Sequence, residues 1–327
     1  MGDQAALRPP LEIGVGFWSM QSTYMRPRPP AFLYREAAVE ARRAEDLGFD
    51  AMWMGEHHLS YDGYCPSLLP AAAGFLTATT HIMVGTGVLV LPFHPAQRVA
   101  EGCAALAAIA PGRLRTAMGI GYRDVEFAAA GLEVRQRARL MDDRLDELLR
   151  PPLRERFGQT ELWFGTGNAA GVARAARHGA SVLLQPAIGR RRIPELRSAW
   201  EADRPALPDG ARPPRFGLMR EVWVEDDPRR LEWIRARLSE MWRHYSNFWV
   251  TDPLSEQDRR EELAGQMSRT AIFGGPAEVT DRLAGLIEAG VDSLTLRVRF
   301  DGVSGPTLDR CLERLAAEVL PELRKAA

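Results

Sequence analysis

Two histidines and a carboxylate stand next to one another in Glu56-His57-His58, directly after the short apolar run Asp50–Met54. An imidazole titrates near neutral pH, so it can donate or accept a proton during a reaction. The apolar run is typical of a β-strand, and parallel α/β proteins carry out their chemistry at the carboxyl ends of their strands. The chain has only six histidines, and the placement of two of them here predicts a functional site.

Three roles are open for Glu56-His57-His58. A metal site needs further ligands, and adjacent side chains at the end of a strand point in different directions. The remaining histidines are expected to lie in no ligand-spaced cluster with acidic residues; they are His81, His94, His178 and His244. A second role is the capping of backbone groups. We favour the third role, a catalytic or cofactor-contacting imidazole whose tautomer and orientation Glu56 could fix, and we predict no metal.

Glycines interrupt two of the apolar runs. Gly85 and Gly87 lie inside the run Val84–Pro92, and the run Met118–Tyr122 has the sequence Met-Gly-Ile-Gly-Tyr. A glycine inside a central strand weakens the strand, so a bulge, tight packing or a ligand lying against the backbone usually accompanies it. Both tight packing inside a barrel and a bound ligand would explain these glycines.

A glycine-rich turn lies in the segment Leu162–Gly171, where a strand, a turn and a helix are predicted with Asn168 as the N-cap. Backbone N–H groups at such a helix start can bind phosphate. A dinucleotide site of this kind needs an acidic residue at the end of the next strand, but Gln185 stands there. A single phosphate, as on FMN, or a plain turn remains. In a mostly solvated basic helix, one of Arg137 or Arg139 could reach inward to an anion.

Short apolar runs alternate with longer amphipathic segments along the chain. The predicted strands are Leu11–Phe17, Asp50–Met54, Ile82–Leu91, Leu114–Ile120, Glu161–Phe164, Ser181–Leu184, Phe216–Val224 and Ser293–Val298. The predicted helices are Leu33–Gly48, Ser67–Thr79, Pro95–Ala108, Arg135–Leu149, Ala169–His178, Arg192–Asp203, Pro228–Tyr245, Pro276–Ala289 and Thr307–Leu323. Eight strands alternating with helices predict an α/β fold of the (β/α)8 TIM-barrel type, with a doubly wound sheet as the second choice.

Residues 1–327 are predicted to form a single domain, because no linker-like stretch divides them. The polar segment Ser246–Gly275 is the most irregular part of the chain and forms an insertion before the last βα unit. Long insertions of this kind are often lids or binding loops.

The composition excludes several classes of protein. With 42 basic and 43 acidic residues, the chain has no charge excess that would attract nucleic acid or an anionic membrane. The three cysteines are far apart and form no CxxC motif, which favours a reducing cytoplasm over a disulfide framework. The N-terminus has no apolar signal core, and no segment is apolar enough for a membrane helix.

Motifs spread over nearly the whole chain share their order and spacing with one known family. They are Glu45–His58, Val84–Pro92 with His94-Pro95, Gly112-Arg113-Leu114, Gly119-x-Gly121, Glu126-Phe127 with Gly131, Phe273–Val279 and Glu318–Pro321. The chain resembles the bacterial luciferase-like flavin-dependent monooxygenases, and although each motif is weak alone, their common order makes the resemblance specific.

The resemblance implies a barrel that binds reduced FMN at its C-terminal mouth. It implies that His57 is the catalytic histidine, that a non-prolyl cis peptide at Gly87-Val88 faces the flavin ring, and that the turn Gly167-Asn168-Ala169 binds the phosphate. The full set of expected cofactor contacts is Glu56, His58, Thr86, Gly87, Val88, Gly121, Tyr122, Gly165, Thr166, Gly167, Asn168, Ala169 and Gln185.

The sequence departs from the luciferase subgroup at two positions. Ile120 replaces an arginine that grips the flavin phosphate, and Gly119 replaces a reactive cysteine. Aldehyde luminescence is therefore not implied. The chain between Leu149 and Glu161 is also short, so the usual insertion before the fifth strand is missing, which would widen the mouth for a bulky substrate.

The resulting hypothesis is a two-component monooxygenase that uses O2 and reduced FMN supplied by a separate, transiently bound flavin reductase. Its substrate is a small organic molecule, apolar or aromatic, in a pocket predicted to be lined by Trp18, Met20, Trp242, Phe248 and Trp249. One alternative is an oxidoreductase that transfers hydride with the deazaflavin F420. A second alternative is a non-catalytic flavin-binding homologue. The resemblance also implies a homodimer formed through Ala-rich helices.

Overall fold

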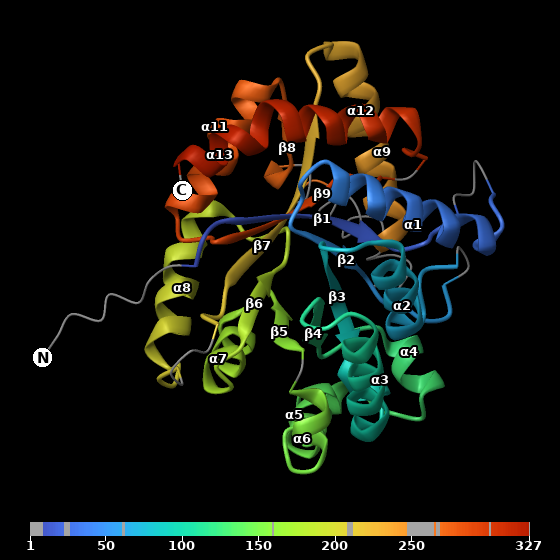
Figure 1. Ribbon diagram of the computed structural model, residues 1–327, viewed down its shortest axis with the longest axis vertical. Coiled ribbons are helices and arrows are strands. Elements are labelled where there is room, and N and C mark those ends of the chain that lie inside the picture. The colour runs from blue at the N-terminus through green and yellow to red at the C-terminus, as the bar shows by residue number, and fades with distance from the viewer. Residues whose placement is uncertain are drawn as a thin grey trace, which may run out of the picture.

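The computed structural model describes residues 9–22, 27–60, 63–158, 160–207, 212–246, 265, 269–300 and 302–326. Eight parallel strands close into a barrel (Figure 1). They are β1 (Glu12–Trp18), β2 (Ala51–Met54), β3 (Met83–Val90), β4 (Leu114–Gly119), β5 (Glu161–Thr166), β6 (Ser181–Leu184), β7 (Phe216–Val224) and β9 (Ser293–Arg297). The barrel closes where β9 pairs with β1, in a register that runs from Glu12↔Ser293 to Gly16↔Arg297. The predicted (β/α)8 barrel is thus confirmed, and the doubly wound sheet is wrong.

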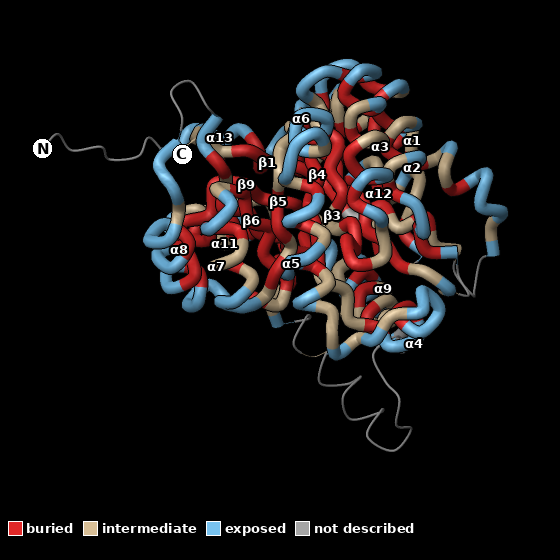
Figure 2. The backbone as a smooth tube through the Cα atoms, turned by 90° about the horizontal axis from the view of Figure 1, so that it is seen from below, coloured by how far each residue is buried: buried red, intermediate tan, exposed pale blue. Residues whose placement is uncertain are grey.

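Helices cover the outside of the barrel, and the strands are buried behind them (Figures 1 and 2). The helices that match predicted segments are α1 (Pro30–Asp46), α2 (Leu68–Ala78), α3 (Ala96–Ile109), α5 (Arg137–Leu148), α7 (Ala169–Arg177), α8 (Ile193–Ala202), α9 (Pro228–Ser246) and α11 (Pro276–Glu288). The predicted last helix is α12 (Pro306–Arg314) and α13 (Leu320–Ala326), joined by a π-helical turn, Leu315–Val319. None of the described helices is long and apolar enough to cross a membrane.

Three short elements were not predicted. Helix α4 (Asp124–Ala129) follows β4, and helix α6 (Leu153–Phe157) lies in the short connection before β5. Strand β8 (Ile272–Gly274) lies inside the segment expected to be irregular and pairs with the end of β7, at Val222↔Ile272. Each has at most six residues, too few to show a hydrophobic period in sequence.

The lower part of the barrel interior is filled by an aromatic layer. Trp53 and Trp163 meet edge to face with ring centroids 5.2 Å apart, and a Cβ on Gly85 would overlap the Trp53 ring. Tight packing therefore explains this glycine. Beneath Trp163, at the amino ends of the strands, the buried Arg115 pairs with Glu12 and with Glu161. Free volume inside the barrel is left at the carboxyl ends.

Candidate active site

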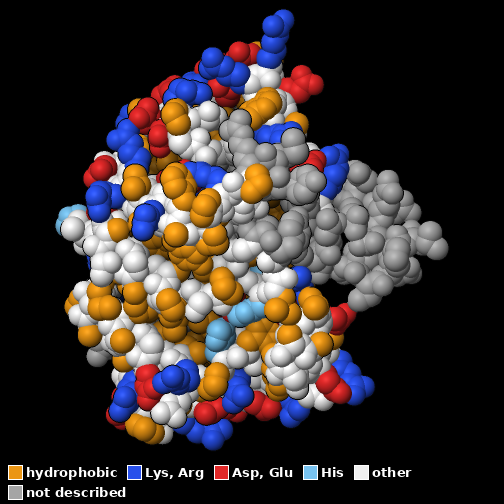
Figure 3. Space-filling model, turned by 90° about the vertical axis from the view of Figure 1, so that its right-hand side faces the viewer, with side chains coloured by type: hydrophobic (Ala, Val, Ile, Leu, Met, Phe, Trp, Pro, Cys, Tyr) orange, Lys and Arg blue, Asp and Glu red, His pale blue; other side chains and the backbone are white. Residues whose placement is uncertain are grey.

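A cavity of about 320 Å³ lies at the carboxyl ends of the barrel strands, which is the position of active sites in this fold. Histidine side chains surrounded by hydrophobic ones are visible on this side of the molecule (Figure 3). The residues that line the cavity are Gly55, Glu56, His57, Tyr64, Gly87, Val88, Val90, Gly119, Ile120, Gly121, Tyr122, Glu126, Arg137, Gly165, Gln185, Pro186, Ala187, Met219, Trp242, Tyr245 and Arg297.

His57 is the centre of a buried hydrogen-bond network in this cavity. Its Nδ1 lies 3.1 Å from Glu126 Oε1. Its Nε2 lies 2.9 Å from the hydroxyl oxygen of Tyr245 and 2.9 Å from that of Tyr122. The two hydroxyl oxygens are 2.5 Å apart. Both ring nitrogens of His57 are thus engaged, one by an acid and the other by phenols.

Glu126 is held as a carboxylate. The same Oε1 atom accepts hydrogen bonds from the backbone N–H of His58, at 2.7 Å, and from Nη1 of Arg123, at 2.7 Å. Burial would raise the pKa of Glu126, but the hydrogen bond from His57, the His58 N–H and the Arg123 charge together keep this pKa below its usual value.

The network assigns the tautomer of His57. A carboxylate has no proton to donate, so Nδ1–H donates to Glu126 and Nε2 accepts. Burial raises the pKa of Tyr122 and also the pKa of Tyr245, so both remain neutral phenols. The Tyr245 hydroxyl can donate to the single lone pair of Nε2 while it accepts the hydroxyl of Tyr122. The geometry is that of a general base whose proton-accepting atom faces the cavity.

A second cluster joins Glu56, His58 and His94. Glu56 Oε1 lies 2.6 Å from His58 Nε2 and 2.8 Å from His94 Nε2, and Oε2 accepts the backbone N–H of Val90 at 3.0 Å. Burial opposes ionisation of Glu56, yet the two histidines keep its pKa below the usual value, and Glu56 in turn raises the pKa of His58. Glu56 therefore ties the loop after β2 to the end of β3.

Two sequence-based expectations fail at this point. Glu56 does not orient His57, because that role is taken by Glu126 on helix α4. His94 was expected in no cluster with acids, but it shares Glu56 with His58, and one ligand atom from each lies within 4.8 Å of the others. As expected, the side chains of His57 and His58 diverge: each contacts a different carboxylate.

A glycine-lined wall faces His57 across strands β3, β4 and β5. The Gly87-Val88 peptide is cis, as the resemblance implied, and both residues line the cavity. Val88 packs over Gly119 and Gly165: a Cβ on Gly119 would overlap Val88 Cγ2, and one on Gly165 would overlap Val88 Cγ1. Gly121 has a φ of 70°, which favours glycine. The glycines thus leave room for Val88 to pack against the wall and keep bulky side chains away from these positions.

The turn between β5 and α7 has the predicted cap. Asn168 Oδ1 accepts the backbone N–H of Gly171 at 3.0 Å, which confirms it as the N-cap. Gln185 lines the cavity beside this turn. Arg137 also lines the cavity and donates to the carbonyl of Val134 at 3.1 Å, whereas Arg139 is exposed and pairs with Asp143. Of the two arginines considered from sequence, the structure brings Arg137 inward.

Several expected cofactor contacts lie behind the cavity wall. Thr86 is fully buried and donates to the carbonyl of Ala117 at 2.9 Å, and Thr166 is hydrogen-bonded to the backbone of Asn168. The expected contacts that do not line the cavity are His58, Thr86, Thr166, Gly167, Asn168 and Ala169, whereas Glu56, Gly87, Val88, Gly121, Tyr122, Gly165 and Gln185 line it.

Of the residues expected to contact the substrate, some line the cavity and others do not. Trp242 lines the cavity. Trp18 and Met20 do not, which corrects the prediction: Trp18 is buried and donates its indole N–H to Glu40 of helix α1. Phe248 and Trp249 lie outside the described residues.

Sequence reasoning did not assign roles to three residues of the site: Glu126, Tyr245 and Arg297. Glu126 lies in the first turn of α4, three residues after Arg123, a spacing that pairs charges on a helix. Tyr245 follows Trp242 by three residues on α9, so both face the cavity. Arg297 ends β9, where it pairs with buried Glu221 at 2.8 Å.

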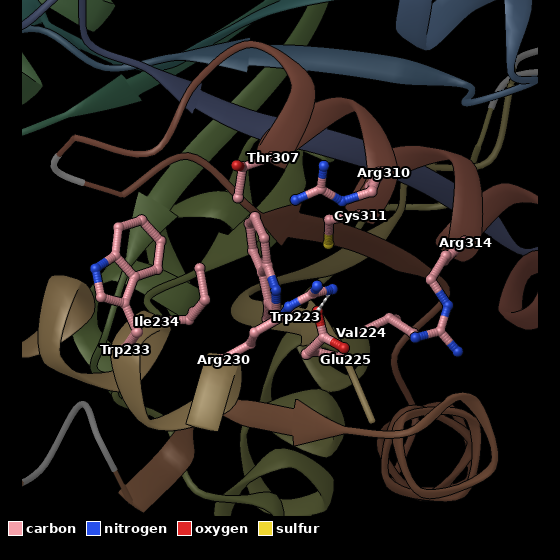
Figure 4. Close-up of a pocket in the computed structure, with 10 residues that line it drawn as sticks. All are labelled: Trp223, Val224, Glu225, Arg230, Trp233, Ile234, Thr307, Arg310, Cys311 and Arg314. Carbon is pink, nitrogen blue, oxygen red and sulfur yellow. Dashed lines mark ion pairs between the residues drawn. The ribbon is translucent and has the colours of Figure 1, made fainter. Parts of the chain in front are cut away.

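A second cavity, of about 290 Å³, lies between α9 and α12 at the end of β7. Trp223 and Trp233 stand on one side of it and Arg310 and Cys311 on another (Figure 4). Burial raises the pKa of the Cys311 thiol to about 12, so it is not a nucleophile at neutral pH. This cavity offers no acid–base pair comparable to His57 and Glu126 among the residues that line it.

Comparisons with known proteins agree with this geometry. The model of the family "Luciferase-like monooxygenase" matches residues 15–293. The chain is 23% identical to the oxygenase component of the flavin-dependent trigonelline monooxygenase of Acinetobacter baylyi, over 88% of this chain and 89% of that protein. The fold is similar to that of monooxygenase RslO1 from Streptomyces bottropensis, with a TM-score of 0.77 and 18% identity over 95% of this chain and 99% of that chain.

A third similarity concerns a different cofactor. The fold matches an F420-dependent secondary alcohol dehydrogenase with a TM-score of 0.73 and 18% identity, over 96% of this chain and 99% of that chain. Taken with the barrel, the His57 network and the glycine wall, the match of the family model over most of the sequence identifies the chain as a member of the luciferase-like monooxygenase family.

Proposed function

We propose that the protein is a reduced-FMN-dependent monooxygenase that receives its flavin from a separate reductase. One observation carries the proposal: the His57–Glu126 pair and the glycine-rich wall of Gly87, Gly119, Gly121 and Gly165 line the same cavity at the barrel mouth. The wall offers a surface for a planar ring, and the His57–Glu126 pair offers an acid–base group.

The residues present fit a flavin mononucleotide. Gly119 and Gly165 keep bulky side chains away from the wall. Arg137 brings a guanidinium to the cavity, and in the described part of the chain it has no carboxylate partner. This guanidinium would hold the phosphate through charge-assisted hydrogen bonds.

Reduced flavin, when bound, would supply two electrons and the activation of O2. The protein's own contribution is to hold the flavin, to exclude water and to move a proton. His57 Nε2 is the atom that accepts or returns the proton, because Nδ1 is committed to Glu126. Trp242 and Tyr245, from the last turn of α9, line the cavity, and their rings would help to exclude water from it.

The second candidate function is F420-dependent hydride transfer. It is favoured by the similarity to the F420-dependent alcohol dehydrogenase and by a wall that suits either planar ring system. The third is a non-catalytic flavin-binding protein, against which the intact His57–Glu126 pair argues.

The proposal is tested by mixing the purified protein with reduced FMN or with reduced F420, each with and without O2, and following cofactor oxidation by absorbance. We expect reduced FMN to bind and to consume O2 in the presence of a substrate. Tight binding of F420 alone would rule out the first function. A His57→Gln variant is expected to bind FMN but to lose turnover, and His81→Gln, at an exposed position, is the matched control.

The same proposal includes a cytoplasmic location and a homodimer. Cys65, Cys103 and Cys311 are free, buried thiols, which suits a reducing compartment. The Ala-rich helices α2 and α3 present small side chains for close packing. Light scattering of the purified protein would show a mass of one or two chains.

A further inference from the structure

We propose that the substrate of this site is a phenol, bound with its hydroxyl group on Nε2 of His57 in the place that the Tyr245 hydroxyl occupies. The inference rests on the proposed monooxygenase function and adds the class of substrate to it.

The first observation is that the site already accommodates phenols. Three tyrosine rings surround the imidazole of His57 edge to face, with centroid distances of 4.7 Å for Tyr64, 5.5 Å for Tyr122 and 5.4 Å for Tyr245. Two of their hydroxyl groups reach Nε2. An aromatic ring with a hydroxyl group therefore matches the shape and the hydrogen-bonding pattern of this part of the cavity.

The second observation is that Tyr245 and Tyr122 belong to different elements of the fold. It lies in the last turn of α9, whereas Tyr122 lies directly after β4, next to the glycine wall. A substrate that replaces the Tyr245 hydroxyl on Nε2 leaves Tyr122 in place. The Tyr122 hydroxyl can then donate to the oxygen of the substrate, as it is placed to do with the oxygen of Tyr245 at 2.5 Å.

The third observation is the charge around this position. Glu126 stabilises the imidazolium that forms when Nε2 takes a proton. Burial raises the pKa of Tyr245, but the positive charges of Arg297 and Arg123 act in the opposite direction at its hydroxyl. The guanidinium of Arg297 stacks 5.0 Å above the Trp242 ring, which is in turn edge-on to Tyr245. Burial remains the largest effect, so a phenol at this position is bound neutral and gives up its proton only during the reaction.

The chemistry follows from deprotonation. The phenol O–H bond breaks and its proton moves to His57 Nε2, which makes the ring carbons ortho and para to the oxygen electron-rich. Overall, one phenol, one O2 and one reduced FMN give one dihydroxyarene, one oxidised FMN and one water. A ring C–H bond and the O–O bond break, a C–O bond forms, and the two electrons come from the reduced flavin.

The probe is 4-nitrophenol, whose phenolate absorbs visible light, added to the full-length protein loaded with oxidised FMN and without any reductant. We expect the probe to bind as the neutral phenol with its O–H donated to His57 Nε2, so that burial raises the apparent pKa of the probe as it raises the pKa of Tyr245. The shift should be lost in His57→Gln. It should be strongly reduced in Glu126→Gln, a positioning residue that acts through His57. His81→Gln is the control and should bind like the wild type. Circular dichroism of each variant shows that it is folded.

A second probe, 4-nitroanisole, has no acidic hydroxyl group and should bind equally to the wild type and to His57→Gln. Tyr245→Phe removes the hydroxyl that the substrate must replace and should tighten 4-nitrophenol binding severalfold. The proposal is overturned if 4-nitrophenol does not bind, if it binds without a change of its pKa, or if His57→Gln leaves the shift intact. Because no turnover is measured, the titration can be run with protein loaded with oxidised FMN or with oxidised F420, and its outcome is then separate from the question of the cofactor.

Discussion

Replacing Gly119 by alanine tests the packing of Val88 in the glycine-lined wall of the cavity. A Cβ at position 119 would overlap Val88 Cγ2 and would lie 3.2 Å from Val88 Cβ. Overpacking of this kind costs about 1–3 kcal/mol in unfolding free energy. Val88→Ala removes two methyl groups from a half-buried side chain, which costs about 1 kcal/mol.

The double variant tests whether the two side chains compete for the same space, because Val88→Ala removes the Cγ2 atom that the new Cβ at position 119 would overlap. We expect the double variant to be about as stable as Val88→Ala alone, which corresponds to a coupling free energy of about 1–3 kcal/mol. Urea unfolding followed by tryptophan fluorescence gives the four free energies.

The matched control is Gly74→Ala in helix α2, where an added Cβ would meet no atom within 4 Å. This change should stabilise the protein by about 0.5–1 kcal/mol. If the effects of Gly119→Ala and Val88→Ala on the free energy of unfolding are additive, the two side chains do not compete for the same space. The packing of Val88 on Gly119 would then not explain the glycine at this position.

Three further predictions concern separate parts of the molecule. Arg137→Met should weaken FMN binding about tenfold or more, as expected for a charge-assisted hydrogen bond to phosphate, whereas Arg139→Met should not; quenching of flavin fluorescence measures both. Glu45 accepts backbone N–H groups after α2, and although burial opposes ionisation these hydrogen bonds lower its pKa to about 2. The ionised Glu45 therefore stabilises the protein above pH 4.5, and this contribution is lost as the pH falls toward 2. In Glu45→Gln the free energy of unfolding should fall less between pH 4.5 and pH 2 than in the wild type, as unfolding curves at each pH would show. Trp18→Phe should lower the free energy of unfolding by about 1–3 kcal/mol, because it removes the indole N–H that donates to buried Glu40 and leaves Arg299 as the remaining donor. It should leave the Michaelis constant unchanged; a changed Michaelis constant would restore Trp18 to the substrate pocket.

The fold was predictable because each strand and helix is indicated by residues that are neighbours in the sequence. Each barrel strand is a short apolar run bounded by polar or glycine residues, and the cap at Asn168 follows from its side chain and its position before a helix. His57 was predictable for the same reason, since it follows a strand directly.

The partners of His57 were not predictable from spacing. Glu126 is 69 residues away in sequence and Tyr245 is 188 residues away, so only the closed barrel and the path of α9 bring them together. Trp18, in contrast, was assigned to the substrate pocket from the sequence although its side chain lies elsewhere. It lies at the end of a strand near the mouth, but its side chain points toward α1, and the sequence of one strand does not state which face is the inner one where both faces are buried.

The aromatic layer of Trp53 and Trp163, with Arg115 beneath it, has a kinetic consequence. This layer closes the amino end of the barrel. Ligands therefore enter and leave the cavity above it through the mouth at the carboxyl end. The component bound deepest must arrive first and depart last. For the proposed flavin-dependent reaction, steady-state kinetics should therefore show ordered binding, with the cofactor ahead of the substrate and the product leaving before the cofactor.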